Sequence, residues 1–234
     1  LYRLVGSEMC IRDSTDPLGL LPIDVVSDEN GVVMVELPIG EWSISDNSDE
    51  EYILIEEVTV EDSDMNFDFT YSTSVWVNGS IETPNTAGLT YEEWLAFPDD
   101  EKLYTDATSV PVVFHNSEFE FTAVTDQSGE FSQRLPAGMT FNLNAQSSFE
   151  NYAAGLIVTV TEGMTELDTL VLEPTVAVIG KVHLFDNETN WNQDIPNYEP
   201  VEIHATGEDG VVWKTETDES GTFNFVLLNG TWAF

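Results

Sequence analysis

Apolar and polar positions alternate over short stretches of this chain, and three of these stretches share one arrangement. Each begins with a turn of the form Asp-x-(Asn/Ser)-Gly, and apolar residues follow at positions +5, +7 and +9 from the aspartate. A second glycine stands at +12, so the copies run from Asp28 to Gly40, from Asp126 to Gly138 and from Asp218 to Gly230. Asp first and Gly last favour a type I turn, and alternation favours a half-buried strand. Each copy therefore predicts a hairpin tip followed by a strand.

The residues at the alternating positions support this interpretation. They are Val33, Val35 and Leu37, then Phe131, Gln133 and Leu135, then Phe223, Phe225 and Leu227, with Gln133 the one polar member. An aromatic residue near the start of the next predicted strand follows each second glycine: Trp42, Phe141 or Trp232. Because the spacing is the same in three places, the pattern indicates an internal repeat.

Other segments recur in phase with this repeat. Residues 75–79 are echoed by residues 176–180, and residues 111–115 by residues 200–204. The aspartates lie 98 and 92 residues apart, which sets the length of one module. Short strands separated by Gly, Pro, Asn and Asp are typical of a β-sandwich. We therefore expect an all-β protein of tandem seven-stranded antiparallel β-sandwich modules.

The repeat also predicts the domain boundaries. Residues 15–73 correspond to the C-terminal part of a truncated module, residues 74–174 to a complete module, and residues 175–234 to the N-terminal part of another truncated module. Residues 1–14 do not fit the pattern. They hold the only cysteine and two of the six basic residues, and they closely resemble the translated read-through of a sequencing adapter, an artefact of metagenomic assemblies. We expect them to be an artefactual or disordered tail.

The repeated motif resembles that of a known family. Thr125–Phe131 and Thr217–Phe223, together with the glycines and aromatics around them, resemble the carboxypeptidase regulatory-like domain, a transthyretin-like sandwich, over nearly all of residues 15–234. Collagen-adhesin B-type repeats, carbohydrate-binding-like folds and bacterial Ig-like domains remain alternatives. The resemblance implies an accessory module of a multidomain surface protein, with no catalytic residues to carry over.

The net charge of the chain limits the classes of partner that it can bind. There are 44 acidic residues against six basic ones, a formal net charge of -38. Such a surface repels nucleic acid and anionic lipid, and no stretch approaches the 18 apolar residues that a spanning helix needs. We expect no nucleic-acid partner and no direct membrane insertion. We also expect no enzyme activity, because the chain contains none of the familiar catalytic motifs.

Two segments are candidates for binding. The second module has an insertion at residues 83–108, in which Trp94 and Phe97 are candidate ligand contacts; a short helix there is plausible, and a cap over a sandwich edge is the alternative. The loop at residues 186–194 offers oxygen ligands for Ca²⁺, the one cofactor that the sequence suggests, although a solvated acidic loop is the commoner explanation. Its candidate ligands are Asp186, Glu188, Asn190 and Asp194.

These observations favour a non-catalytic structural or spacer repeat of a secreted or cell-surface protein. The alternative is a carbohydrate-binding or Ca²⁺-stabilised adhesion module, with carbohydrate or other surface proteins as partners. The tryptophans discriminate between them, because core-facing rings favour the spacer and a coplanar exposed pair favours sugar binding. The rings concerned are Trp76, Trp94, Trp191 and Trp213. His115 and His204 occupy equivalent repeat positions, which favours a structural role for both.

Overall fold

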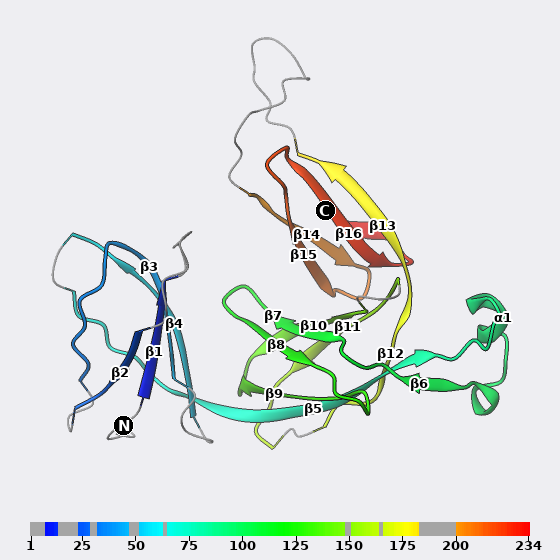
Figure 1. Cartoon of the computed structure of the whole chain (residues 1–234), viewed down its shortest axis with the longest axis horizontal. Helices are drawn as coiled ribbons and strands as arrows, with labels where there is room; N and C mark the ends of the chain where they lie inside the picture. Colours follow the sequence, from blue (N-terminus) through cyan, green and yellow to red (C-terminus); the bar gives the residue numbers. More distant parts are fainter. Residues whose placement is uncertain are drawn as a thin grey trace, which may run out of the picture. The chain divides into compact units, whose positions relative to one another are not determined.

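The computed structural model describes residues 8–13, 23–28, 32–46, 52–62, 65–147, 151–163, 166–182 and 200–234. These residues form antiparallel sheets almost throughout (Figure 1), which confirms the predicted all-β sandwich class. A single α-helix, α1 (Tyr91–Leu95), and a 3-10 helix, η1 (Asp99–Glu101), interrupt the strands of this part of the chain. Neither of these helices has the length and apolar character that crossing a membrane requires.

The chain divides into two compact units. Unit 1 comprises residues 1–76, 134–138 and 161–164, and unit 2 comprises residues 77–133, 139–160 and 165–234. In unit 1, four strands pair in the order β2-β1-β3-β4, and the first residues of β5 join β4. Trp42, Ile44, Leu54 and Val58 form the core of this unit. The strands are β1 (Glu8–Asp13), β2 (Ile23–Val26), β3 (Gly40–Asp46), β4 (Tyr52–Val60) and β5 (Ser72–Pro84).

The structure differs from the sequence-based expectation at two places in unit 1. Glu8–Asp13, expected to lie in a tail outside the fold, forms β1 and pairs with both β2 and β3. The edge of β3 carries backbone donors and acceptors that need partners, and β1 supplies them.

The second difference concerns the first copy of the repeat. Residues 32–39, predicted to alternate as a strand, are described and belong to no strand. In the other copies the corresponding strands, β9 (Glu130–Pro136) and β16 (Thr222–Leu228), pair with β5 and β13 (Glu173–Lys181), respectively. No described strand pairs with residues 32–39, and an alternating stretch without a pairing partner has no ladder to join.

Unit 2 is built from three groups of strands. A six-stranded sheet has the order β16-β13-β11-β10-β7-β8, a three-stranded sheet has the order β15-β14-β17, and β5 carries β6, β9 and β12 as neighbours. The strands of the six-stranded sheet are β7 (Pro111–His115), β8 (Glu120–Val124), β10 (Thr140–Gln146), β11 (Tyr152–Thr159), β13 (Glu173–Lys181) and β16 (Thr222–Leu228). The others are β6 (Tyr104–Asp106), β9 (Glu130–Pro136), β12 (Leu170–Val171), β14 (Glu202–Gly207), β15 (Val212–Glu216) and β17 (Trp232–Ala233).

The six-stranded sheet packs face to face against the group around β5. Val112 and Phe114 of β7 are fully buried, as are Val77 and Ile81 of β5. The rings of Phe114 and Phe131, one from each layer, lie 6.1 Å apart. Alternate residues of the strands thus fill a shared interior, as expected for two packed sheets.

The turns of the repeat have the same hydrogen bonds. The amide of Asp126 donates to Glu130 O at 2.8 Å, and the amide of Asp218 donates to Thr222 O at 2.8 Å. In each turn the aspartate carboxylate also accepts from two later amides. Gly129 and Gly221 have φ of 71° and 75°, so the predicted need for glycine is confirmed at both positions.

The repeat also fixes contacts across the sheets. A Cβ on Gly79 would lie 2.5 Å from the ring of Phe131, and one on Gly180 would lie 2.2 Å from the ring of Phe223. Each phenylalanine therefore covers a glycine of the neighbouring strand, and a side chain at either glycine would displace the ring.

Candidate functional site

The outer face of the six-stranded sheet has an unusual composition. Along β7, Val112 and Phe114 point into the core, while Pro111, Val113 and His115 alternate with them on the other face. That face continues onto β10, where Asn142 pairs in register with His115. The outer face of these strands is therefore apolar at one end and rich in amide and imidazole groups at the other.

Strand β15 of the three-stranded sheet lies on this face, and its residue Val212 makes three hydrogen bonds to side chains of the face. The amide of Val212 donates to Asn142 Oδ1 at 2.9 Å. The carbonyl oxygen of Val212 accepts from Asn144 Nδ2 at 3.1 Å and from His115 Nε2 at 3.0 Å. Both backbone groups of one residue are thus bound by side chains about 70 to 97 positions away in the sequence. We call Asn142, Asn144 and His115 the Val212 clamp.

The close approach of β15 depends on a glycine in the sheet beneath it. Gly155 of β11 pairs with Asn144, and a Cβ built on it would lie 2.9 Å from Val211 Cγ1 and 3.4 Å from Trp213 Nε1. Val211 and Trp213 belong to a buried cluster that also contains Ala153, which lies on β11 as Gly155 does. Small residues in β11 therefore leave the room that the bulky residues around β15 occupy.

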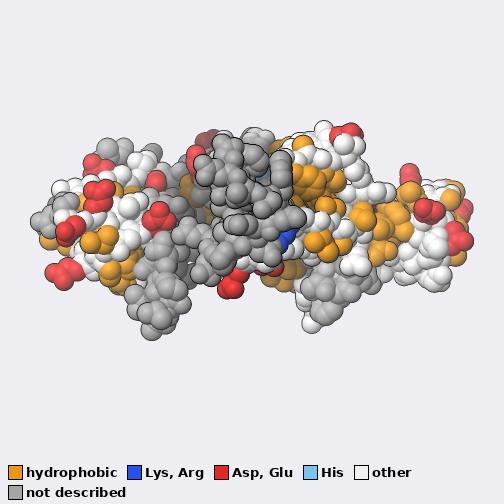
Figure 2. Space-filling view, turned by 90° about the horizontal axis from the view of Figure 1, so that it is seen from above, with side chains coloured by type: hydrophobic (Ala, Val, Ile, Leu, Met, Phe, Trp, Pro, Cys, Tyr) orange, Lys and Arg blue, Asp and Glu red, His pale blue; other side chains and the backbone are white. Residues whose placement is uncertain are grey.

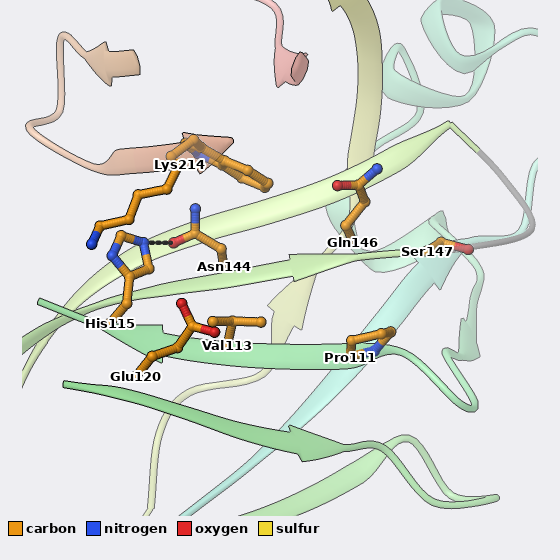
Figure 3. A pocket seen from close by; sticks show the side chains of 9 residues that line it. Pro111, Val113, His115, Glu120, Asn144, Gln146, Ser147 and Lys214 are labelled. Atoms are coloured by element: carbon orange, nitrogen blue, oxygen red, sulfur yellow. Dashed lines mark hydrogen bonds between the residues drawn. The ribbon is translucent and has the colours of Figure 1, made fainter. Parts of the chain in front are cut away.

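Beside the clamp lies a cavity of about 450 Å³ (Figure 3). Its walls include Pro111, Val113 and Gln146 from the sheet and Lys214 from β15. The Lys214 ammonium donates to Asn116 O at 3.3 Å and lies 3.6 Å from the Glu202 carboxylate. The cavity therefore combines apolar residues with uncharged polar groups, the Glu120 carboxylate and the Lys214 ammonium, which already has partners.

His115 is the most constrained group at this site. Its side chain is 3% exposed, and Nε2 lies 3.2 Å from Asn144 Oδ1 as well as 3.0 Å from Val212 O. Because Val212 O can only accept, Nε2 carries the proton and the neutral ring presents a lone pair at Nδ1. Within the described part of the chain, Nδ1 has no hydrogen-bond partner, and neither has Trp213 Nε1.

Burial is the main cause that lowers the pKa of His115, and the Lys214 ammonium is the second. The hydrogen bonds to Asn144 and Val212 and the carboxylate of Glu120 act in the opposite direction. Glu120 is the cross-strand neighbour of His115 on β8. The balance favours a neutral imidazole, which is the form that the geometry requires.

The predicted ligand contacts, Trp94 and Phe97, lie at a different place in unit 2. They belong to the insertion, where a capping box between Thr90 and Glu93 starts α1. The structure thus contains the short helix that the sequence suggested. Figure 2 shows hydrophobic side chains and carboxylates side by side around this segment, at the right of the view.

Trp94 is committed to the insertion itself. Only 5% of it is exposed, its ring stacks on Tyr91 with centroids 5.5 Å apart, and Nε1 donates to Leu103 O at 3.2 Å. Lys102 Nζ lies 5.3 Å from the ring centroid. Phe97, in contrast, is 42% exposed. The structure therefore gives the two candidate residues separate environments rather than one binding surface.

The other candidates are distributed as follows. Trp213 is 6% exposed and Trp76 is 50% exposed, while Trp191 lies outside the described residues. The candidate Ca²⁺ ligands Asp186, Glu188, Asn190 and Asp194 also lie outside them. Among the residues that the structure describes, no group of three or more His, Cys, Asp or Glu side chains is arranged to hold a metal ion.

The alternation of residues on β10 indicates the polar face on which the clamp lies, but it does not reveal which strand covers that face. Asn142 and Asn144 alternate with Phe141 and Leu143 in a predicted strand, which places two amides on the face away from the core. The sequence pattern equated His115 with His204, but the strand registers correct this: His204 corresponds to Val113, two residues before His115 on the same face. Two adjacent strands with polar amide and imidazole groups at matching positions would have indicated a covered polar surface.

Fold and site together define an all-β sandwich protein in which side-chain hydrogen bonds join two sheets of unit 2. No protein-family profile matches the sequence, and no curated protein matches it. Five chains of solved structures match, among them the Bacillus anthracis TIE protein. That match covers 98% of this chain and 41% of the other, at 17% identity and a TM-score of 0.29, so this chain spans less than half of that protein's length. A score this low carries no argument about function.

Proposed function

We propose that this chain is a non-catalytic structural spacer of a secreted or cell-surface multidomain protein, built from modules of the carboxypeptidase regulatory-like kind. The observation that carries the proposal is the Val212 clamp. A spacer must hold successive sheets in a fixed orientation, and here three side chains bind both backbone groups of one residue. Hydrogen bonds at a buried site fix geometry more sharply than apolar contact alone.

The use of the large aromatic rings supports the same proposal. Trp42 is 2% exposed and donates from Nε1 to Pro38 O at 3.0 Å, and Trp232 donates in the same way to Leu228 O at 2.9 Å. Trp94 and Trp213 are buried as well. Of the described tryptophans, Trp76 alone offers an open face, so a coplanar pair of exposed rings is not present in this part of the chain. The acidic surface would keep neighbouring copies apart.

Spin labels test this proposal. One label at Thr122, exposed on β8, and one at Glu208, exposed beyond β14, report the distance between the two sheets once Cys10 is replaced by serine. We expect a narrow distance distribution in the native chain. Asn142→Ala with Asn144→Ala should broaden it, and Asn151→Ala, an exposed change away from the clamp, should not. A broad distribution in the native chain would rule out a spacer held at this contact.

A second candidate function is carbohydrate binding, and the cavity beside the clamp favours it. Its volume of about 450 Å³ lies within the range of small-ligand sites. Titration with a panel of mono- and disaccharides, followed by tryptophan fluorescence, tests it through Trp213. Absence of saturable binding at millimolar sugar would remove this candidate. Calcium-stabilised adhesion stays a prediction, tested by melting curves with and without millimolar Ca²⁺.

A further inference from the structure

His115 joins two sheets through Nε2, and its other ring nitrogen, Nδ1, is buried without a hydrogen-bond partner among the described residues. A second proton on the ring would therefore be costly. We propose that protonation of His115 weakens the Val212 clamp, so that the docking of the three-stranded sheet on the six-stranded sheet of unit 2 depends on pH. The argument rests on the same hydrogen bonds as the spacer proposal, and the two can fail separately.

The geometry determines which form of the ring fits. In the neutral form Nε2–H donates to Val212 O at 3.0 Å, and the lone pair of Nδ1 is buried without a partner. A proton on Nδ1 would create a buried N–H donor and a positive charge at an atom that has no hydrogen-bond partner among the described residues. An unpaired buried charge is far more costly than an unpaired buried lone pair.

The charged groups on the surrounding elements do not offset this cost. From β15, Lys214 places a second positive charge near the ring, and its pairing with Glu202 of β14 is loose at 3.6 Å. From β10, Asn142 and Asn144 are uncharged. From β8, Glu120 is the one carboxylate that favours the imidazolium, and it is exposed to solvent, which screens it. The ring can gain a proton at low cost only by leaving the clamp.

The direction of the pH effect follows from these facts. The pKa of His115 in the folded chain lies below its ordinary value of 6.5. The docked state therefore binds fewer protons than the undocked state, whose ring is in water. Docking is fully stable above about pH 6.5 and weakens as the pH falls from there toward the pKa of the folded state.

The chain contains its own control, because His204 lies on β14, the strand that corresponds to β7 in the next copy of the repeat. Its side chain is 51% exposed, and Nε2 lies 2.5 Å from Glu202 Oε1. The exposed ring makes its hydrogen bond within its own sheet, so a substitution at His204 has no reason to disturb the docking.

The experiment is amide hydrogen exchange of the full chain from pH 7.5 to pH 5, with the Val212 amide as the probe. After correction for intrinsic exchange, protection of Val212 should be constant above pH 6.5 and fall by up to about tenfold per pH unit below it. His115→Gln keeps an uncharged donor near the position of Nε2 and should give a flat profile. His204→Gln should behave as the native chain does.

A second measurement keeps the inference testable if His115→Gln does not fold. NMR titration of the His115 ring in the native chain should show the Nε2–H tautomer and a pKa below 6.5. A pKa of 6.5 or higher, or equal Val212 protection at pH 7.5 and pH 5, would overturn the inference. A narrow label distance at pH 7.5 that persists at pH 5 would leave the spacer proposal standing and remove this one.

Discussion

His115 and His204 lie on corresponding strands, β7 and β14, of two copies of one repeat, yet their environments are opposite. His115 is 3% exposed and is bound by Asn144 and by the backbone of Val212. The side chain of His204 is 51% exposed and reaches the Glu202 carboxylate on its own strand. Each strand pairs with the strand that precedes an Asp-x-x-Gly turn, and the registers place His204 two residues earlier in its strand than His115, so both side chains are on the same face. The difference comes from β15, which covers the first histidine, and nothing among the described residues covers the second in the same way.

The framework that the two copies share extends beyond the turns. Val110 and Val201 each donate from their amides to a threonine hydroxyl, Thr125 or Thr217, at 2.9 Å. In return each threonine amide donates to the carbonyl oxygen of the same valine at 3.0 Å. Identical residues make identical contacts here because the partners come from the same copy. The environment of a histidine differs because its partner comes from another one.

The largest effect is expected at a shared framework position. Gly129→Ala should destabilise unit 2 by about 3 kcal/mol, since its φ of 71° is strained for alanine and the new Cβ would lie 2.5 Å from Ile81 O. Gly138→Ala is the control, because its φ is 84° and no atom lies within 4 Å of the added Cβ. It should cost about 1 kcal/mol. Urea denaturation measures both, and equal losses would mean that the contact with Ile81 does not matter.

The next prediction concerns the histidines themselves. His115→Ala should cost about 2 kcal/mol, because it leaves Val212 O with one donor fewer and opens a void under β15. His204→Ala should change stability by less than about 0.5 kcal/mol, as for other exposed substitutions. Denaturation at pH 7.5 compares the two variants. Similar losses would mean that the cover over His115 contributes little.

Much of the fold could be predicted because its signals are local. The Asp-x-x-Gly turn, the alternation after it and the small residue beneath each phenylalanine lie within a few positions or one module of each other. The exceptions are instructive. Residues 32–39 have the alternation without a neighbouring strand, and Glu8–Asp13 form a strand in a segment that the repeat does not include. Pairing depends on what stands alongside, and alternation alone does not report it.

The site could be predicted much less well. The contact between His115 and Val212 joins residues 97 positions apart, and the chain between them includes most of two sheets. Trp213 was a candidate for sugar stacking, but it fills the space above Gly155 instead. An aromatic residue in a strand has the same signature in the sequence whether it faces solvent or another sheet, since the sheet that covers it is specified elsewhere.

Gly155→Val should remove the difference between the two histidines, because it displaces β15 from β11. The added Cβ would lie 2.9 Å from Val211 Cγ1, so the three-stranded sheet must shift, at a cost of about 1–2 kcal/mol. The pKa of His115 should then rise toward 6.5, because the ring loses part of its cover. Leu156→Val, on the opposite face of β11, is the control and should leave the ring titration unchanged. NMR titration of His115 in both variants is the measurement.

The smallest effects are expected from substitutions of the charged residues beside the His115 ring. They test the comparison of the two histidines while β15 still covers His115. Lys214→Met deletes a positive charge that lowers the pKa of His115, so that pKa should rise; Glu120→Gln deletes a negative charge that raises it, so that pKa should fall. The change at Lys214 should be the larger one, because its charge contributes more than that of the exposed Glu120. As the pKa of the folded state approaches 6.5, less docking stability is lost on acidification. Val212 protection should therefore depend less on pH in Lys214→Met and more in Glu120→Gln than in the native chain. Shifts of the same sign in both variants would show that the surroundings of His115 act through packing rather than through charge.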